Sequence, residues 1–139
     1  MKHASLLLAA SCLLSFVNAQ WLEATIQLPG SSGPMALGWN PQNDKVYCAD
    51  SGADNVTVLN GATNQVMATV QVGDGPHFFC YNPHDNKMYC SIYYGGNVVA
   101  IDGASNQVVA TVPAGIAPAP CATTLKTTRS IVPTSSGAT

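Results

Sequence analysis

Short apolar stretches alternate with clusters of Asn, Asp, Gly and Pro along most of the chain. Residues 35–39 alternate up to the turn signal "NPQND", and "KVYCA" follows as a return strand. "DSGAD" then precedes "NVTVL", and "NGATN" precedes "QVMATVQV". The apolar stretches are rich in Val, Thr and Tyr, which favour strands, and the polar clusters contain the residues that favour turns. Residues 34–75 therefore predict four short antiparallel strands.

The pattern then repeats without a gap. Residues 34–75 align with residues 76–117 at a period of 42, the spacing of Pro34 and Pro76. The two units share Asn40/Asn82, Pro41/Pro83, Lys45/Lys87, Tyr47/Tyr89, Asn55/Asn97, Gly61/Gly103 and Asn64/Asn106. Upstream, "ATIQLPGSSGP" (24–34) resembles the end of the unit, "ATVQVGDGP", with two residues inserted. Four strands in about forty residues are typical of a β-propeller blade.

The repeat predicts an all-β fold of four-stranded antiparallel propeller blades, incomplete, with about two blades and one outer strand. Blade repeat 1 spans 34–75 and blade repeat 2 spans 76–117, whereas 20–33 is expected to form an outer strand of a closing blade plus a loop. Propellers contain about four to eight blades. Two blades leave apolar faces and sheet edges open, so self-association is possible, unless the chain is part of a longer protein. A β-sandwich built by duplication is the alternative fold.

Residues 1–19 read as a signal peptide. "MKH" supplies a short positive region, "ASLLLAASCLLSFV" is apolar, and "VNA" provides a cleavage site before Gln20. A membrane anchor or a buried helix is the alternative, but no later segment approaches the length of a membrane span. We expect a secreted, periplasmic or cell-surface protein without a transmembrane segment in the mature chain.

Residues 118–139 depart from the repeat, although a third blade should begin at Pro118. Synonymous codons chosen for Cys121 to Thr134, read one frame away, spell "CYNPQNDKVYCAN", which is the blade motif. We therefore expect this segment to be a degenerate or frameshifted start of blade repeat 3, without ordered structure. An ordinary disordered tail rich in Thr and Ser is the alternative.

Charge and cysteine content narrow the functional classes. All seven acidic residues lie between Gln20 and Pro118, and only Lys45 and Lys87 oppose them in that range, which argues against nucleic-acid binding. Cys48 and Cys90 share one repeat position and are expected to be small buried side chains. Export would permit disulfides, and the redox state of Cys48, Cys80 and Cys90 stays open. Their spacing matches no zinc-site pattern.

The stretch "KVYCADSGADNVTVLNGATNQVMATVQVGDGPH" is similar to the YVTN-type β-propeller repeat of secreted and surface-layer-like proteins. The resemblance covers nearly all residues from Ala24 to Pro118, with cysteine where the family usually has threonine. It implies that the first strand of each unit lines a central channel and that the last strand is outermost. The implied inner strands are 35–39 and 77–81, and the implied outer strands are 66–72 and 108–112.

Candidate binding residues cluster near one end of the predicted blades. His77 follows the "GDGP" loop and is expected near the entrance of the central channel. Asp50, Asp54, Tyr93 and Tyr94 are expected in strand-connecting loops on the same end. Together they predict a polar and aromatic binding surface. No catalytic residue, metal ligand or cofactor site is predicted.

These expectations favour a binding or structural module whose partner is a protein, a glycan or a small molecule. The alternative is the N-terminal part of a propeller enzyme, because lactonase-type and quinoprotein-type propellers have similar repeats. The fold alone does not select between these classes.

Overall fold

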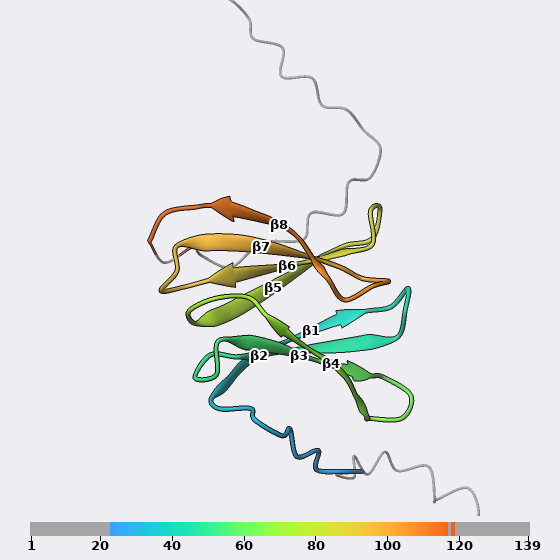
Figure 1. Cartoon of the computed structure of the whole chain (residues 1–139). Helices are drawn as coiled ribbons and strands as arrows, with labels where there is room; N and C mark the ends of the chain where they lie inside the picture. Colours follow the sequence, from blue (N-terminus) through green and yellow to red (C-terminus); the bar gives the residue numbers. More distant parts are fainter. Residues whose placement is uncertain (1–22, 117, 119–139) are drawn as a thin grey trace, which may run out of the picture.

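The computed structural model describes residues 23–116 and residue 118, and their strands form two four-stranded antiparallel sheets (Figure 1). The first sheet, blade 1, has the order β1-β2-β3-β4, and the second, blade 2, has the order β5-β6-β7-β8. The strands are β1 Pro34–Asn40, β2 Lys45–Asp50, β3 Asn55–Asn60, β4 Val66–Gln71, β5 Pro76–Asn82, β6 Lys87–Ile92, β7 Asn97–Asp102 and β8 Val108–Pro113. This confirms the predicted all-β architecture and the four strands per repeat.

The turns recur because residues that tolerate a left-handed backbone recur at the same repeat positions. Asp44 and Asn86 have φ values of 48° and 49°, and Asn64 and Asn106 both have 60°. Asn and Asp adopt this conformation more readily than other residues with a side chain. The same turn geometry therefore fixes the same strand register in both blades.

Each blade has two faces, because successive side chains of a strand point to opposite sides. We call face A the side that carries Lys45, Tyr47 and Ala49 in β2 and their equivalents in β6. Face B carries Val46, Cys48 and Asp50 and their equivalents. The cross-strand pairs Tyr47↔Val58 and Val46↔Leu59 extend these two faces into β3.

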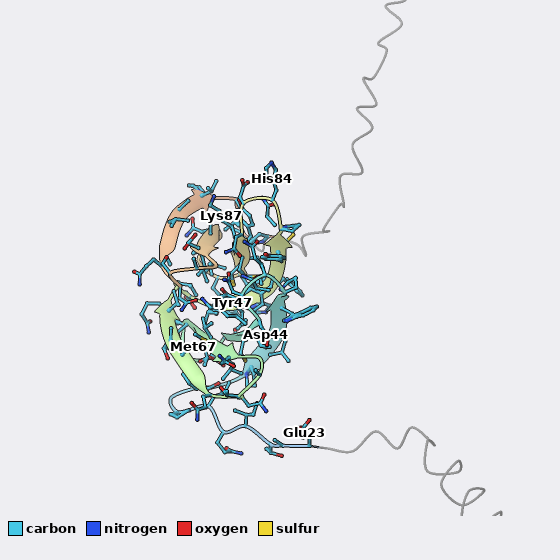
Figure 2. The ribbon with its side chains drawn as sticks, turned by 90° about the vertical axis from the view of Figure 1, so that its right-hand side faces the viewer. Glu23, Asp44, Tyr47, Met67, His84 and Lys87 are labelled. Atoms are coloured by element: carbon cyan, nitrogen blue, oxygen red, sulfur yellow. The ribbon has the colours of Figure 1, made fainter. Side chains whose placement is uncertain are left out.

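Face A of blade 1 packs on face B of blade 2. Tyr47 is fully buried between the two sheets (Figure 2). The core cluster consists of Tyr47, Val56, Val58 and Val70 from blade 1 and Met88, Cys90, Ile92, Val99 and Ile101 from blade 2. Opposite faces of the two repeats are in contact, so the repeats are stacked in one direction. A sandwich made by a two-fold related duplication would instead pair like faces.

The two blades approach most closely at their first strands. Between the sheets, the backbone contacts are concentrated on β1 with β5 and on β2 with β5. A Cβ atom added to Gly38 in β1 would lie 2.8 Å from Cβ of Phe79 in β5. Only glycine permits this close approach. The blades therefore converge at their first strands.

Within the described residues, the outward faces of the pair are only partly covered, and the segment before β1 lies over part of the face of blade 1. Val70 on face A of blade 1 is 8% exposed, whereas its repeat equivalent Val112 on blade 2 is 57% exposed. On face B of blade 1, Leu37 is 71% exposed. The arrangement is a stack of two blades with an apolar surface at each end.

Three predicted segments have different outcomes. Glu23–Leu28, the described part of the expected outer strand, has no regular secondary structure, because no strand lies beside it to complete a ladder among the described residues. The expected signal peptide (1–19) lies outside the described residues. So does the expected third-repeat segment (118–139), apart from Pro118. Within the described chain, no helix has the length and apolar character needed to cross a membrane.

Cys48 and Cys90 are buried, as their shared repeat position predicted. Burial raises the pKa of each thiol to about 12, and the neighbouring Asp50 contributes at Cys48. In the unfolded chain a thiol titrates near pH 8.5. Above that pH the unfolded state binds fewer protons than the folded state, so stability falls as the pH rises toward 12.

We expect the free energy of unfolding to fall by up to about 1.4 kcal/mol per thiol per pH unit above about pH 9. Urea unfolding under reducing conditions at pH 8 and pH 10 measures this fall. The double variant Cys48→Ala/Cys90→Ala should show a shallower pH dependence than the wild type. Equal slopes in the two proteins would contradict the buried-thiol explanation.

Candidate functional site

An aromatic cluster forms at the loop end of blade 2. The register of β5 with β6 shifts between Pro76 and Phe78, which makes His77 the extra residue of a β-bulge. Bulges redirect a side chain, and they are frequent beside functional sites. The ring of His77 stacks on Tyr93, with centroids 4.6 Å apart and planes at 22°. Tyr94 packs edge-on against Tyr93 at 5.0 Å.

The loop backbone joins this cluster to blade 1. Asp54 accepts a hydrogen bond from the Gly75 amide at 3.1 Å. A Cβ atom on Gly75 would lie 2.4 Å from the Tyr94 ring, and Gly75 has a φ of 74°. Glycine at this position thus allows Tyr94 to lie against the loop. Tyr94 is 67% exposed, so its ring remains accessible.

The orientation of His77 determines its hydrogen-bonding capacity. Its Nδ1 lies 3.1 Å from the carbonyl oxygen of Gly75. A carbonyl can only accept, so Nδ1 carries the proton in the neutral ring and Nε2 holds the lone pair. The cluster therefore combines two phenol hydroxyls, one imidazole acceptor and the nearby carboxylate of Asp54. This is a surface for stacking and hydrogen bonding.

The structure brings four of the five predicted residues together. His77, Tyr93 and Tyr94 are in mutual ring contact, and Asp54 joins them through Gly75. The expected loop position of Asp50 is wrong. Asp50 is the last residue of β2 and is fully buried. Its carboxylate accepts hydrogen bonds from the hydroxyls of Ser31 and Thr57, the latter at 2.6 Å.

The repeat alignment indicates the buried position of Asp50. Asp50 aligns with Ile92, which is buried on face B of blade 2. The alignment with Ile92 therefore indicates that Asp50 lies in a strand and points toward a segment that packs on the sheet. The carboxylate is tolerated there because Ser31 and Thr57 supply donors. Asp50 holds the 29–33 loop on blade 1 and does not belong to the aromatic surface.

Replacing Asp50 should therefore affect stability and leave the aromatic surface intact. We expect Asp50→Ala to lower the free energy of unfolding by about 1.5 kcal/mol, through the loss of charge-assisted hydrogen bonds. Urea unfolding of wild type and variant measures the difference. Asp54→Ala is the matched control, since this exposed carboxylate should contribute well under 1 kcal/mol. A larger loss for Asp54→Ala than for Asp50→Ala would contradict these assignments.

Sequence reasoning missed a set of polar contacts between the blades. Lys45 is 6% exposed, and its Nζ donates to the carbonyl oxygens of Gly103 (2.6 Å) and Ala104 (3.0 Å) and to Oδ1 of Asn106 (2.9 Å). Burial lowers the pKa of Lys45, and the charge of Asp102 opposes that effect. The sequence feature that indicates these contacts is the repetition of polar residues at fixed positions, Lys45/Lys87 and Asn64/Asn106.

A second polar contact joins the hairpin ends of the blades. The Asn40 amide donates to Oδ1 of Asn86 at 2.9 Å, and the Asn86 amide donates to Oδ1 of Asn43 at 2.7 Å. Asn40 is fully buried, so these bonds satisfy groups that would otherwise be costly to bury. The repeated Asn residues are therefore structural. Among the residues that the structure describes, no group of three or more His, Cys, Asp or Glu side chains is placed to hold a metal ion.

Comparisons with known proteins identify the fold. No protein-family model matches the chain, and no curated protein matches it in sequence. The β-propeller domain of Cps50 (Swd1) from Myceliophteria thermophila has a similar structure, with a TM-score of 0.55 and 12% identity over 65% of this chain. The two sheets are blades of a partial β-propeller.

Two further solved structures are similar. They are the hydrazine synthase of Kuenenia stuttgartiensis (TM-score 0.61, 18% identity, 72% of this chain) and apo AztD of Citrobacter koseri (TM-score 0.55, 15% identity, 66% of this chain). The match spans 28% of the hydrazine synthase chain, 28% of the Cps50 domain and 27% of AztD. At these identities the likeness concerns the fold alone.

Proposed function

We propose that the chain is part of a secreted or cell-surface β-propeller repeat protein of the YVTN type, serving as a binding or structural module. The similarity of the repeat to the YVTN pattern and the apolar N-terminal segment support this proposal. The observation that carries the binding role is the aromatic surface of His77, Tyr93 and Tyr94. A bulge and a tight glycine loop hold it on a rigid blade.

Of the three ligand classes expected from the sequence, this surface suits a glycan best. The exposed ring of Tyr94 offers an apolar face against which the C–H side of a sugar ring can pack. Nε2 of His77, the tyrosine hydroxyls and the Asp54 carboxylate surround it with groups that bind sugar hydroxyls. Rigid aromatic side chains with polar tips provide contact area at a small entropic cost.

A glycan microarray probed with the labelled full-length chain tests the proposal. We expect binding to a restricted set of glycans, and we expect Tyr94→Ala to weaken it about tenfold or more, as for a central aromatic contact. Trp39→Ala is the control, because Trp39 is also exposed but lies on β1 next to the hairpin at the other end. Absence of glycan binding, or equal binding by Tyr94→Ala, would refute the glycan-binding role.

A further inference from the structure

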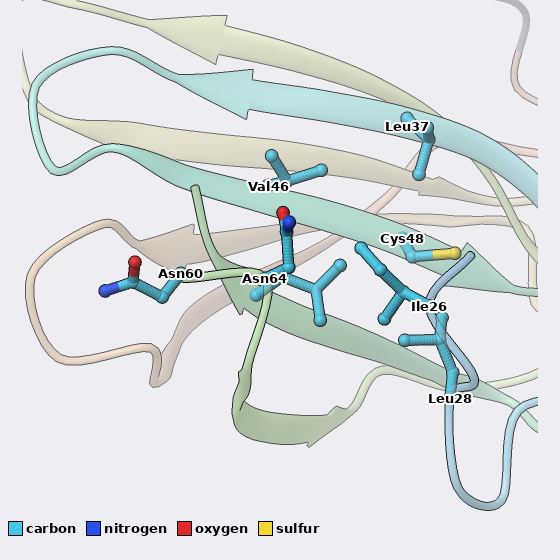
Figure 3. A pocket seen from close by; sticks show the side chains of 8 residues that line it. Ile26, Leu28, Leu37, Val46, Cys48, Asn60 and Asn64 are labelled. Atoms are coloured by element: carbon cyan, nitrogen blue, oxygen red, sulfur yellow. The ribbon is translucent and has the colours of Figure 1, made fainter. Parts of the chain in front are cut away.

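Face B of blade 1 carries a hollow of about 250 Å³ (Figure 3). Its lining is mostly apolar and includes two asparagines. The residues that line it are Ile26, Leu28, Leu37, Val46, Cys48, Leu59, Asn60 and Asn64. Six of these belong to blade repeat 1, so each has an equivalent 42 residues later in blade repeat 2.

On blade 2, the equivalent residues are already covered by Tyr47 of blade 1. On blade 2 they are Phe79, Met88, Cys90, Ile101, Asp102 and Asn106. Tyr47 of blade 1 is buried in the core cluster with Met88, Cys90 and Ile101, and its ring lies 6.2 Å from that of Phe79. The hollow on blade 1 is therefore the counterpart of the surface that receives Tyr47 on blade 2.

The hydrogen-bond acceptors that bind Lys45 on blade 2 also have counterparts on blade 1. Lys45 binds the turn between β7 and β8 through the carbonyls of Gly103 and Ala104 and through Asn106. The turn between β3 and β4 has the same backbone bonds: Asn64 N to Asn60 O and Asn106 N to Asp102 O both measure 2.9 Å. The carbonyls of Gly61 and Ala62 and the Asn64 side chain thus form an equivalent acceptor set.

Blade 2 presents the matching donor. Lys87 and Tyr89 occupy the positions of Lys45 and Tyr47 on face A of β6, and both are half-buried and accessible. Val112, on the same face in β8, is exposed. Each copy of the chain therefore carries one donor face and one receptor face. The two faces match each other in the same way as the faces that already pack within the chain.

We propose that a second copy of this chain docks blade 2 on blade 1, with Tyr89 filling the hollow and Lys87 binding the turn at 61–64. The contact is head-to-tail, so repeated docking closes into a ring when the rotation permits. Asn60 stands where blade 2 has Asp102, so the contact between copies lacks one favourable charge.

The segment 23–28 competes for part of this receptor. Ile26 and Leu28 line the hollow and align with Val70 and Val72 of blade 1. A docking blade 2 supplies Val112 at the position that Ile26 covers. The segment has no regular secondary structure, so its displacement requires no strand pairing to be broken. Its displacement should therefore be a modest cost of association.

Sedimentation velocity of the full chain, over a range of concentrations and without any glycan, tests the proposal. We expect concentration-dependent association into a discrete species. Tyr89→Ala impairs the donor face, and Asn64→Gly impairs the receptor face while keeping the backbone φ of 60°. Each should raise the dissociation constant about tenfold or more. Tyr94→Ala, at the loop end, is the control and should associate like the wild type.

Mixing the two impaired variants gives the sharpest result. Tyr89→Ala keeps an intact receptor face and Asn64→Gly keeps an intact donor face, so a heterodimer with one productive contact should form. Lys87→Met offers a milder donor variant whose fold can be checked by circular dichroism. Ile26→Ser/Leu28→Ser should strengthen association by removing the competing segment.

A wild-type chain that stays monomeric at all concentrations would overturn the proposal, as would a mixture that forms no heterodimer. Weaker association of Ile26→Ser/Leu28→Ser would also overturn it, because the segment would then belong to the incoming blade. In that case, residues 24–28 would form the outer strand of the blade that covers the hollow, and that blade would supply only the other three strands. The effect of Tyr94→Ala on glycan binding tests only the proposed function. The glycan-binding proposal and the association proposal can therefore fail separately.

Discussion

Tyr47→Ala should lower the free energy of unfolding by about 3 to 5 kcal/mol, which is the cost of removing a large aromatic side chain from a core. Tyr47 is fully buried between the two blades, in one core cluster with Met88 and Ile101. Chemical denaturation followed by circular dichroism measures the loss. The variant should also unfold less cooperatively, because Tyr47 is the largest buried side chain between the sheets.

Tyr89→Ala is the matched control for this prediction. Tyr89 has the same repeat position, but it lies on the open face A of blade 2 and is only half-buried. Measured at a concentration where the chain is monomeric, this variant should lose no more than about 1 kcal/mol. Equal losses at the two tyrosines would mean that both faces are covered in the monomer, which contradicts the stacking of the blades.

Lys45→Met should lower the free energy of unfolding by about 2 to 3 kcal/mol, since it removes hydrogen bonds from a charged donor and leaves partly buried acceptors unpaired. Methionine keeps the apolar stem in place, so the loss reports on the ammonium group. The acceptors are Gly103, Ala104 and Asn106 in the turn between β7 and β8. Urea unfolding at pH 7 provides the measurement.

Lys87→Met is the corresponding control, because no blade lies beside Lys87 within the described residues. Its effect on the monomer should be within about 0.5 kcal/mol, as for a surface substitution. A double-mutant cycle of Lys45→Met with Asn106→Gly should show a coupling of about 0.5 to 3 kcal/mol across the interface. Additive losses would indicate that Lys45 does not hold blade 2.

The sequence predicted the strands well, since the turn residues recur with the repeat. "KVYCA" and "NVTVL" correspond to β2 and β3, each extended by one residue. The pairing of faces was not predictable from the alternation of side chains. Both faces of a blade are apolar, as Tyr47 and Met88 show, so no polar side identifies the outer surface.

The candidate site was partly predictable. His77, Tyr93 and Tyr94 are near one another because the strand order brings the loop between β6 and β7 to the start of β5. The stacking of His77 on Tyr93 depends on a bulge, which leaves no clear mark in a single sequence. Asp50 was misplaced because acidic residues are rare in buried strands, and its partner Ser31 lies in an upstream loop.

The central claim is that consecutive repeats stack as propeller blades, with face A of one on face B of the next. Nuclear Overhauser effects in the monomeric chain, labelled at tyrosine rings and at methionine and isoleucine methyl groups, test it directly. Tyr47 should show strong cross-peaks to the methyl groups of Met88 and Ile101. Cross-peaks between the rings of Tyr47 and Tyr89, without those to Met88, would show that like faces are paired and would contradict the blade arrangement.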